Sequence, residues 1–176
     1  LKWVVKKGTK WHIRGDNGTG KTTLLSMVVA EHPQSWNSRI IENGQQRRTG
    51  KSNYFDINKR IGMSSPELHV IFAKRINDSV TVRECISSGF HEGSANNFIP
   101  MWKKLDKEKQ EIINMYIDYF GIQDIADQKA FEQLTVSEQK LVLFIRALVK
   151  MPEVLILDEA FSGMEVEPVL RCYEFL

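Results

Sequence analysis

An α/β fold is predicted by three features of this sequence of 176 residues. A glycine-rich loop, Gly15 to Thr22, lies between a short apolar segment and a stretch with helical character. The apolar run Val154 to Leu157 has the length and the flanking turn residues of a buried parallel strand. From about Val80 to Lys150, between these two features, the pattern is mainly helical. We therefore expect strands near both ends of the chain and a helical insertion between them.

The N-terminal elements are expected to be two short strands, a loop and a helix. Trp3 to Val5 and Trp11 to Ile13 are apolar enough for strands, and we expect Trp3 to be a core aromatic residue. Thr22 to Glu31 is expected to be a helix that ends before Pro33. The polar stretch from 35 to 52 is expected to hold strands and a loop.

The middle of the chain begins with another predicted strand, Lys59 to Ser64. Ser65 and Pro66 end it, because proline cannot donate to a strand ladder. Thr81 and Glu84 then have the spacing of a capping box, in which each side chain accepts a hydrogen bond from the other residue's backbone. A helix is therefore expected to start there.

Two further helices are predicted in the C-terminal half. Lys107 to Phe120 has apolar residues at helical spacing, with Asp106 placed to cap its start and Gly121 to close its end. Glu138 to Lys150 is the second, and it precedes the apolar strand. Core packing explains the apolar positions of both helices without a functional role.

Composition and charge limit the classes of function. The chain is 42% hydrophobic and 26% charged, with a net charge of +2, which is typical of globular proteins and argues against a dedicated nucleic-acid binder. We accordingly interpret Arg47 and Arg48 as a solvated loop tip. Cys85 and Cys172 lack metal-binding spacing and indicate a reducing compartment. No apolar run approaches the ~18 residues of a membrane span, so we expect a cytoplasmic location.

The most informative motif is the phosphate-binding loop G-x-x-x-x-G-K-[ST]. Its glycines let backbone N–H groups turn toward an anion, and the dipole of the following helix favours negative charge. Lys21 can reach the outer phosphates, and the Thr22 hydroxyl can bind Mg²⁺. The strand–loop–helix context favours this interpretation over an ordinary glycine turn. The motif consists of Gly15, Asp16, Asn17, Gly18, Thr19, Gly20, Lys21 and Thr22.

An acidic pair follows the apolar strand. Asp158 at a strand tip beside a phosphate loop can hold Mg²⁺, directly or through water, and Glu159 can then orient or deprotonate an attacking water. In isolation, a helix cap or a turn would be the more ordinary interpretation of these acids. Together with the phosphate-binding loop they indicate nucleotide hydrolysis.

A third motif makes the pattern specific. Leu134, Thr135, Val136, Ser137, Glu138 and Gln139 precede a helix that leads toward Asp158. With its three motifs in this order, the chain resembles the nucleotide-binding domain of the ATP-binding cassette (ABC) superfamily, whose signature is usually Leu-Ser-Gly-Gly-Gln/Glu-Gln. Ala160 to Glu165 corresponds to that family's D-loop. Ile61 to Leu68 and Thr81 to Phe90 resemble a soluble tandem-cassette group, with bacterial molybdenum- and photorepair-type members and fungal counterparts.

The resemblance implies a fold and a set of roles. The fold would be a P-loop NTPase with a RecA-like core, residues 1–66 and 151–176, and an inserted α-helical subdomain, residues 67–150. Mg-ATP would bind the loop residues from Gly15 through Thr23. Thr22 and Asp158 would hold Mg²⁺, and Lys21 and Glu159 would be catalytic. Leu134 to Gln139 would face ATP bound by a second cassette, in the same polypeptide or a homodimer. The chain would thus be an ATPase that uses ATP as an association switch.

Some residues depart from the family pattern. Val136 and Ser137 replace the two signature glycines, and the β-branched Val136 disfavours close backbone approach, so we expect slow turnover. The Q-loop glutamine is absent, with Glu67 or His69 as substitutes, or with only a turn at that position. The adenine-stacking aromatic residue and the switch histidine would lie outside a chain truncated at both ends.

The biological role stays open among three alternatives: a soluble tandem-cassette ATPase, the nucleotide-binding subunit of a membrane transporter, or a weakly hydrolysing regulatory module. The transporter alternative would add a membrane subunit as a partner and a location peripheral to a membrane. Nucleic acid is not expected as a partner, and no residue indicates a transported substrate.

Overall fold

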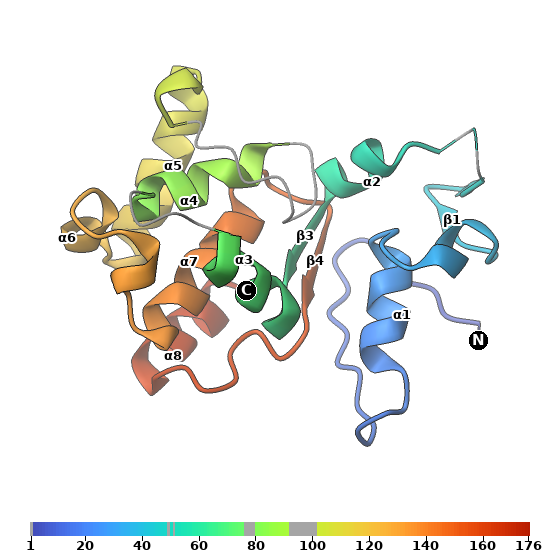
Figure 1. The fold of residues 1–176 in the computed structure, drawn as a ribbon. Helices are drawn as coiled ribbons and strands as arrows, with labels where there is room; N and C mark the ends of the chain where they lie inside the picture. Colours follow the sequence, from blue (N-terminus) through green and yellow to red (C-terminus); the bar gives the residue numbers. More distant parts are fainter. Residues whose placement is uncertain (1, 49, 51, 76–79, 92–101) are drawn as a thin grey trace. The chain divides into compact units, whose positions relative to one another are not determined.

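The computed structural model describes residues 2–48, 50, 52–75, 80–91 and 102–176 (Figure 1). The chain divides into two compact units, Leu1–Ile57 and Asn58–Leu176, and each is described by itself. The division into core and helical subdomain at residues 66 and 150 stays a prediction.

The first unit contains the phosphate-binding loop and a short hairpin. Helix α1 (Lys21–Val28) follows the loop, and the 3-10 turn η1 (Pro33–Trp36) follows α1. Strands β1 (Ile41–Glu42) and β2 (Gln45–Gln46) pair in antiparallel fashion, as expected for this polar stretch. Helix α1 is shorter than predicted, because Ala30 adopts a left-handed backbone conformation with φ +63°.

The two strands predicted before the loop do not form. Residues 3–5 and 11–13 carry no strand assignment, and among the described residues no segment pairs with them. A strand needs a partner for its backbone hydrogen bonds, so apolar character alone was not sufficient. Trp3 is half-buried rather than a core residue, and its ring packs edge to face on that of Trp11 with centroids 5.8 Å apart.

The prediction of a solvated loop tip was right for Arg48 and wrong for Arg47. Arg48 is exposed, whereas Arg47 is 1% exposed. The Arg47 guanidinium donates to the carbonyl oxygens of Met27 and Val28, at 2.7 Å each, and forms an ion pair of 2.6 Å with Glu42. The last turn of a helix leaves carbonyls without intrahelical partners, and this guanidinium binds two of them.

The second unit is built on two parallel strands, β3 (Ile61–Ser64) and β4 (Val154–Leu157), with Ile61 opposite Val154 and Ser64 opposite Leu157. The parallel strand predicted from the apolar run is thus present. Strand β3 begins two residues later than the predicted strand, because Lys59 and Arg60 are the last residues of helix α2 (Tyr54–Arg60).

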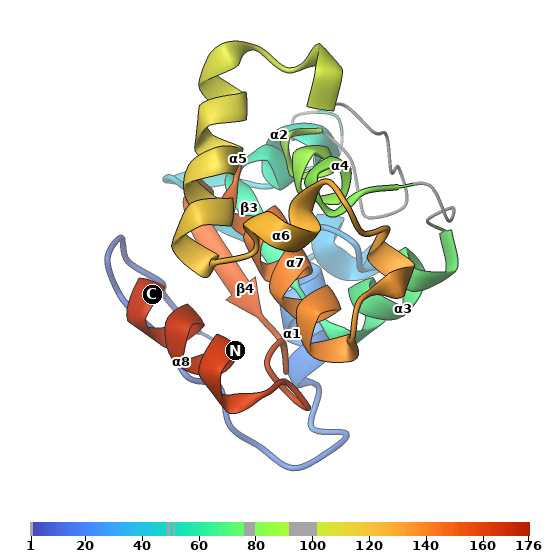
Figure 2. The same ribbon diagram turned by 90° about the vertical axis from the view of Figure 1, so that its left-hand side faces the viewer.

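Helix α7 (Val136–Leu148) lies beside the strand pair in both views (Figures 1 and 2). Gly62 makes this packing close, because a Cβ atom there would lie 2.3 Å from the carbonyl oxygen of Ala147. The remaining helices lie between the strands in sequence or after them: α3 (Pro66–Arg75), α4 (Val82–Ser87), α5 (Lys107–Phe120), α6 (Gln123–Ala126) and α8 (Val166–Phe175), with 3-10 turns η2 (Ser88–Phe90), η3 (Trp102–Lys104) and η4 (Phe131–Gln133).

Several predicted helix ends are confirmed. Thr81 and Glu84 form the capping box of α4. Asp106 accepts from the backbone of Lys109 at the start of α5, and Gly121 closes this helix with φ +66°. Helix α7 begins at Val136, not at Glu138 as predicted, because Thr135 rather than a later residue is its N-cap.

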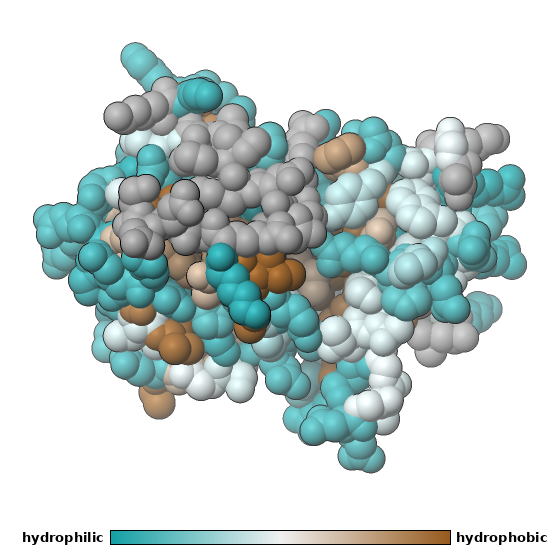
Figure 3. All heavy atoms as spheres, in the orientation of Figure 1, coloured by the Kyte–Doolittle hydropathy of each residue, from teal (hydrophilic) through white to brown (hydrophobic). Residues whose placement is uncertain are grey.

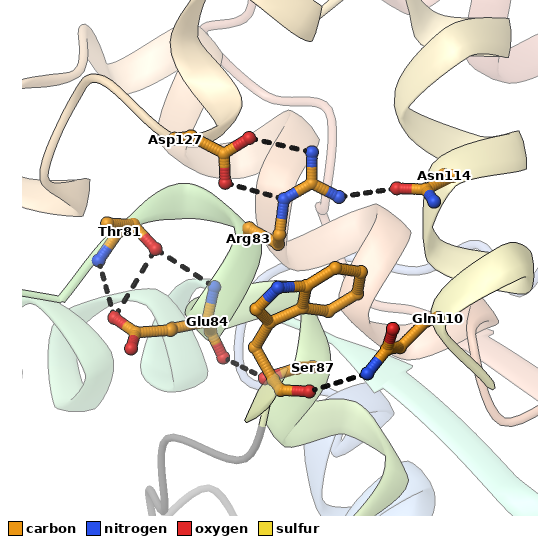
Figure 4. A network of polar contacts seen from close by, with 8 residues as sticks. Thr81, Arg83, Glu84, Ser87, Gln110, Asn114 and Asp127 are labelled. Atoms are coloured by element: carbon orange, nitrogen blue, oxygen red, sulfur yellow. Dashed lines mark hydrogen bonds and ion pairs between the residues drawn. The ribbon is translucent and has the colours of Figure 1, made fainter. Parts of the chain in front are cut away.

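A polar network joins three of these helices (Figure 4). Arg83 of α4 donates through Nε and Nη2 to the carboxylate of Asp127, at 2.6 and 2.8 Å, and through Nη1 to Asn114 of α5 at 2.5 Å. Its guanidinium carbon also lies 4.5 Å from the centroid of the Trp102 ring. This bidentate pairing fixes α4 against α5 and the end of α6.

The core of the second unit is apolar, and its two cysteines are part of it. Cys85 and Cys172 are free and buried, and burial raises the pKa of each thiol to about 12.

On the face drawn in Figure 3, hydrophobic residues form separate patches among hydrophilic ones. Within the described residues, no helix is both long and apolar enough to cross a membrane.

Candidate functional site

The loop before α1 adopts a conformation that glycine makes accessible. Gly18 and Gly20 have φ +82° and +89°, a region that disfavours other L-residues. The Lys21 ammonium donates to the carbonyl oxygens of Gly15, at 2.8 Å, and Asp16, at 2.9 Å. The Thr19 hydroxyl also donates to Asp16, at 2.8 Å. These bonds close the loop on itself and hold the lysine charge beside its backbone.

The loop ends at a helix start that is suited to an anion. Gly20 is the N-cap of α1 and, having no side chain, caps none of the first N–H groups. The first turn, which contains Lys21, Thr22 and Thr23, has no acidic residue. Partial positive charge at a helix N-terminus stabilises a bound phosphate. Thr22 and Thr23 are exposed, and Lys21 is half-buried.

The acidic pair lies at the end of β4 in the second unit. The backbone N–H of Asp158 donates to the carbonyl of Ser64 at 3.0 Å, which extends the pairing of β3 and β4 by one bond. Asp158 is 8% exposed. Glu159 is exposed and has φ +47°, an uncommon conformation for a residue with a side chain. A chain turn therefore begins directly after the strand.

The donor types fit magnesium. Mg²⁺ prefers oxygen ligands and is usually held by one or two carboxylates together with substrate phosphates. Asp158 and Thr22 supply a carboxylate and a hydroxyl, each in its own unit. Among the described residues there is no group of three His, Cys, Asp or Glu side chains that could hold a metal alone. Each of the two side chains is thus of a type that Mg²⁺ accepts, and their joint use stays a prediction.

The segment Leu134 to Gln139 forms the start of α7. Thr135 and Glu138 make a capping box, with the Thr135 N–H 2.7 Å from the Glu138 carboxylate and the Glu138 N–H 3.2 Å from the Thr135 hydroxyl. Leu134 is buried, whereas Val136 is 55% exposed on the first turn. The family motif is thus placed at a helix N-terminus.

The other polar residues of this segment bond within the second unit. The hydroxyl of Ser137 accepts from the backbone N–H of Glu165 at 3.0 Å. The Gln139 amide nitrogen donates to the carbonyls of Phe131 and Leu134, at 3.2 and 3.3 Å. The amide oxygen of Gln139 therefore faces Nε2 of His69, 2.7 Å away. Both side chains fix the helix start to neighbouring segments.

The structure places the two Q-loop candidates differently. Glu67 is exposed in the first turn of α3. His69 is half-buried and joins α3 to α7 through Gln139. The position of His69 along the chain makes it a candidate, but no residue pattern indicates Gln139 as its partner, since the two lie far apart in sequence.

The loop before α1 and the acidic pair after β4 carry the residue pattern of a P-loop nucleotide-binding domain, and comparisons specify the family. Residues 1–162 match the family described as ABC transporter. The whole chain is 65% identical to an uncharacterized ABC transporter ATP-binding protein of Saccharomyces cerevisiae, YDR061W, and covers 33% of it. Over 94% of the chain it is 36% identical to the ABC transporter ATP-binding protein ModF of Escherichia coli, and covers 32% of that protein.

A solved structure agrees on the fold. CbiO1 of Clostridium perfringens, part of an ABC transporter complex, superimposes with a TM-score of 0.63 at 22% identity, covering 91% of this chain and 57% of that one. The chain therefore belongs to the ABC transporter family, as an ATP-binding domain with the P-loop NTPase fold. It spans about a third of the length of the two curated relatives.

Proposed function

We propose that this domain binds and hydrolyses Mg-ATP at the interface between two cassettes. The observation that carries the proposal is the uncapped start of α1, with Gly20 in a left-handed conformation and the Lys21 ammonium held beside the loop backbone. Both the N–H groups and the ammonium carry the charge that a triphosphate needs, at the point where the backbone can approach it most closely.

Each site residue then has a role. Lys21 leaves the Gly15 and Asp16 carbonyls for the outer phosphates and stabilises the charge that develops on the transferred phosphoryl group. Thr22 and Asp158 would hold Mg²⁺, which would supply charge neutralisation on the phosphates. Glu159, exposed directly after β4, orients the attacking water and accepts its proton.

A second cassette completes the proposed site. The start of α7 offers a helix N-terminus whose capping box is internal to the chain, so that further N–H groups of its first turn are available to an opposing phosphate. The curated relatives are about three times as long as this chain, which leaves room for a second cassette in the same polypeptide. ATP binding would then favour the closed pair, and hydrolysis would reopen it.

A weakly hydrolysing regulatory module is the second candidate function. It is favoured by Val136, which is 55% exposed at the position where the family signature has glycine. A branched side chain there keeps an opposing nucleotide away from the backbone.

The relatives' names, which call them ABC transporter proteins, additionally favour a domain that assembles with a membrane subunit. Membrane spans elsewhere in the full-length protein would support that alternative.

Replacement of Lys21 tests the nucleotide site. In the full-length protein, Lys21→Ala removes a charge-assisted contact, so we expect ATP affinity at this site to fall roughly 10- to 100-fold. Titration calorimetry should then count one bound nucleotide fewer per protein at moderate ATP concentration. Lys10→Ala, an exposed lysine of the same unit, is the matched control. Equal affinity and equal stoichiometry in the two variants would refute the assignment.

A further inference from the structure

One face of α7 holds the turn that contains Glu159. We define the acidic turn as residues 159–165, which connect β4 to α8. On α7, Lys140 and Phe144 follow Ser137 by three and seven residues, so the three side chains share one side of the helix. Each of the three contacts the acidic turn.

The three contacts differ in kind. The Ser137 hydroxyl accepts from the N–H of Glu165 at 3.0 Å, and the Lys140 ammonium donates to the carbonyl of Ser162. The ring of Phe144 packs edge to face on that of Phe161, with centroids 5.3 Å apart. The Ser137 bond thus fixes the far end of the turn, and the contacts of Lys140 and Phe144 fix its middle.

Backbone hydrogen bonds within the acidic turn connect these contacts to Glu159. The Ser162 N–H donates to the Glu159 carbonyl at 3.1 Å, and the Met164 N–H donates to that of Phe161 at 3.2 Å. Glu159 itself has φ +47°, which costs free energy and persists only where surrounding contacts enforce it. Outside contacts come from α7 and also from α8, where the ring of Tyr173 packs edge to face on that of Phe161 with centroids 5.4 Å apart.

Ser137 is the informative member. The family signature has glycine at this position, which has no side chain to accept a hydrogen bond. Here the side chain is turned inward, the residue is 6% exposed, and the hydroxyl is used by Glu165. A hydroxyl in this state serves the turn of its own chain rather than a nucleotide on an opposing cassette.

We propose that Ser137 is a positioning residue that, together with Lys140, sets the place of Glu159 through the acidic turn. The inference rests on the proposed role of Glu159 in hydrolysis. If a partner cassette displaces the start of α7, the turn that carries Glu159 moves with it. The signature segment therefore controls a carboxylate in its own chain as well as facing the partner.

Hydrogen exchange tests the contact itself. In the full-length protein, Ser137→Ala removes the acceptor of the Glu165 amide, so we expect this amide to exchange about 5- to 10-fold faster. Ser137→Thr keeps a hydroxyl and should restore protection. Ser87→Ala, at another buried serine, is the matched control. Unchanged exchange at Glu165 in Ser137→Ala would overturn the proposal, and this readout does not depend on any ATPase activity.

Kinetics test the positioning role. Ser137→Ala should lower kcat several-fold at unchanged KM for ATP, and Ser137→Thr should recover it. Placed on top of Glu159→Gln, Ser137→Ala should leave ATP-dependent association of the cassettes unchanged. Weaker association in that double variant would overturn the proposal, because Ser137 would then contact the nucleotide. A Glu159→Gln protein that hydrolyses ATP normally would instead refute the role of Glu159, and the exchange result would still stand.

Discussion

In the first unit, one buried arginine stabilises the C-terminal end of helix α1. Arg47 lies in a polar stretch whose composition predicts a solvated loop, yet its guanidinium binds the last turn of α1 and Glu42. The prediction failed because composition records how polar a segment is, but not whether an unpaired helix end lies within its reach. The left-handed conformations of Gly18 and Gly20 were predictable because the loop motif is local and specified by residue type, whereas the role of these residues in phosphate binding stays a prediction.

Replacement of Arg47 should therefore destabilise the first unit. Arg47→Met keeps much of the buried volume but leaves two carbonyls and the Glu42 carboxylate without this donor. We therefore expect the free energy of unfolding of the first unit to fall by about 2–4 kcal/mol. The loss should appear as faster hydrogen exchange in the last turn of α1. Arg48→Met, at the exposed neighbour, is the control and should change little. Equal exchange in both variants would show that the guanidinium does not hold the helix.

Elements were predictable where both of their ends are set locally. Helix α5 has the predicted bounds because Asp106 and Gly121 act on their own backbone neighbourhood. Strands depend on a partner, so the segments around Trp3 and Trp11 satisfied an apolar pattern without pairing among the described residues. The bond between His69 and Gln139, and the contacts of α7 with the acidic turn, are long-range and have no sequence pattern of their own.

Gly62 tests the packing of β3 against α7. Gly62→Ala would place a methyl group 2.3 Å from the Ala147 carbonyl oxygen, so strand and helix must separate. We expect the second unit to lose about 1–3 kcal/mol of unfolding free energy, measured by denaturant titration. Gly163→Ala meets no atom within 4 Å and carries only the strain of φ +73°, so its loss should be smaller. The reverse order of the two variants would contradict the observed packing.

At the scale of the whole molecule, the parts of the proposed site belong to different units. The phosphate-binding loop lies in Leu1–Ile57, and the acidic pair and the signature segment lie in Asn58–Leu176. The order of the three motifs was enough to indicate the family, because each motif requires a particular strand or helix beside it. Residue patterns could not indicate which cassette supplies the opposing signature, since a second copy of this chain and another cassette of the same polypeptide would fit the same motifs.

X-ray scattering of the full-length Glu159→Gln variant, with and without Mg-ATP, tests whether ATP closes two cassettes on each other. The substitution should block hydrolysis and so hold the ATP-bound state. We predict that Mg-ATP lowers the radius of gyration at constant mass, or doubles the mass if the cassettes lie on separate chains. Adding Lys21→Ala should abolish either change. A variant that demonstrably binds ATP, yet changes neither its radius of gyration nor its mass, would contradict this closure.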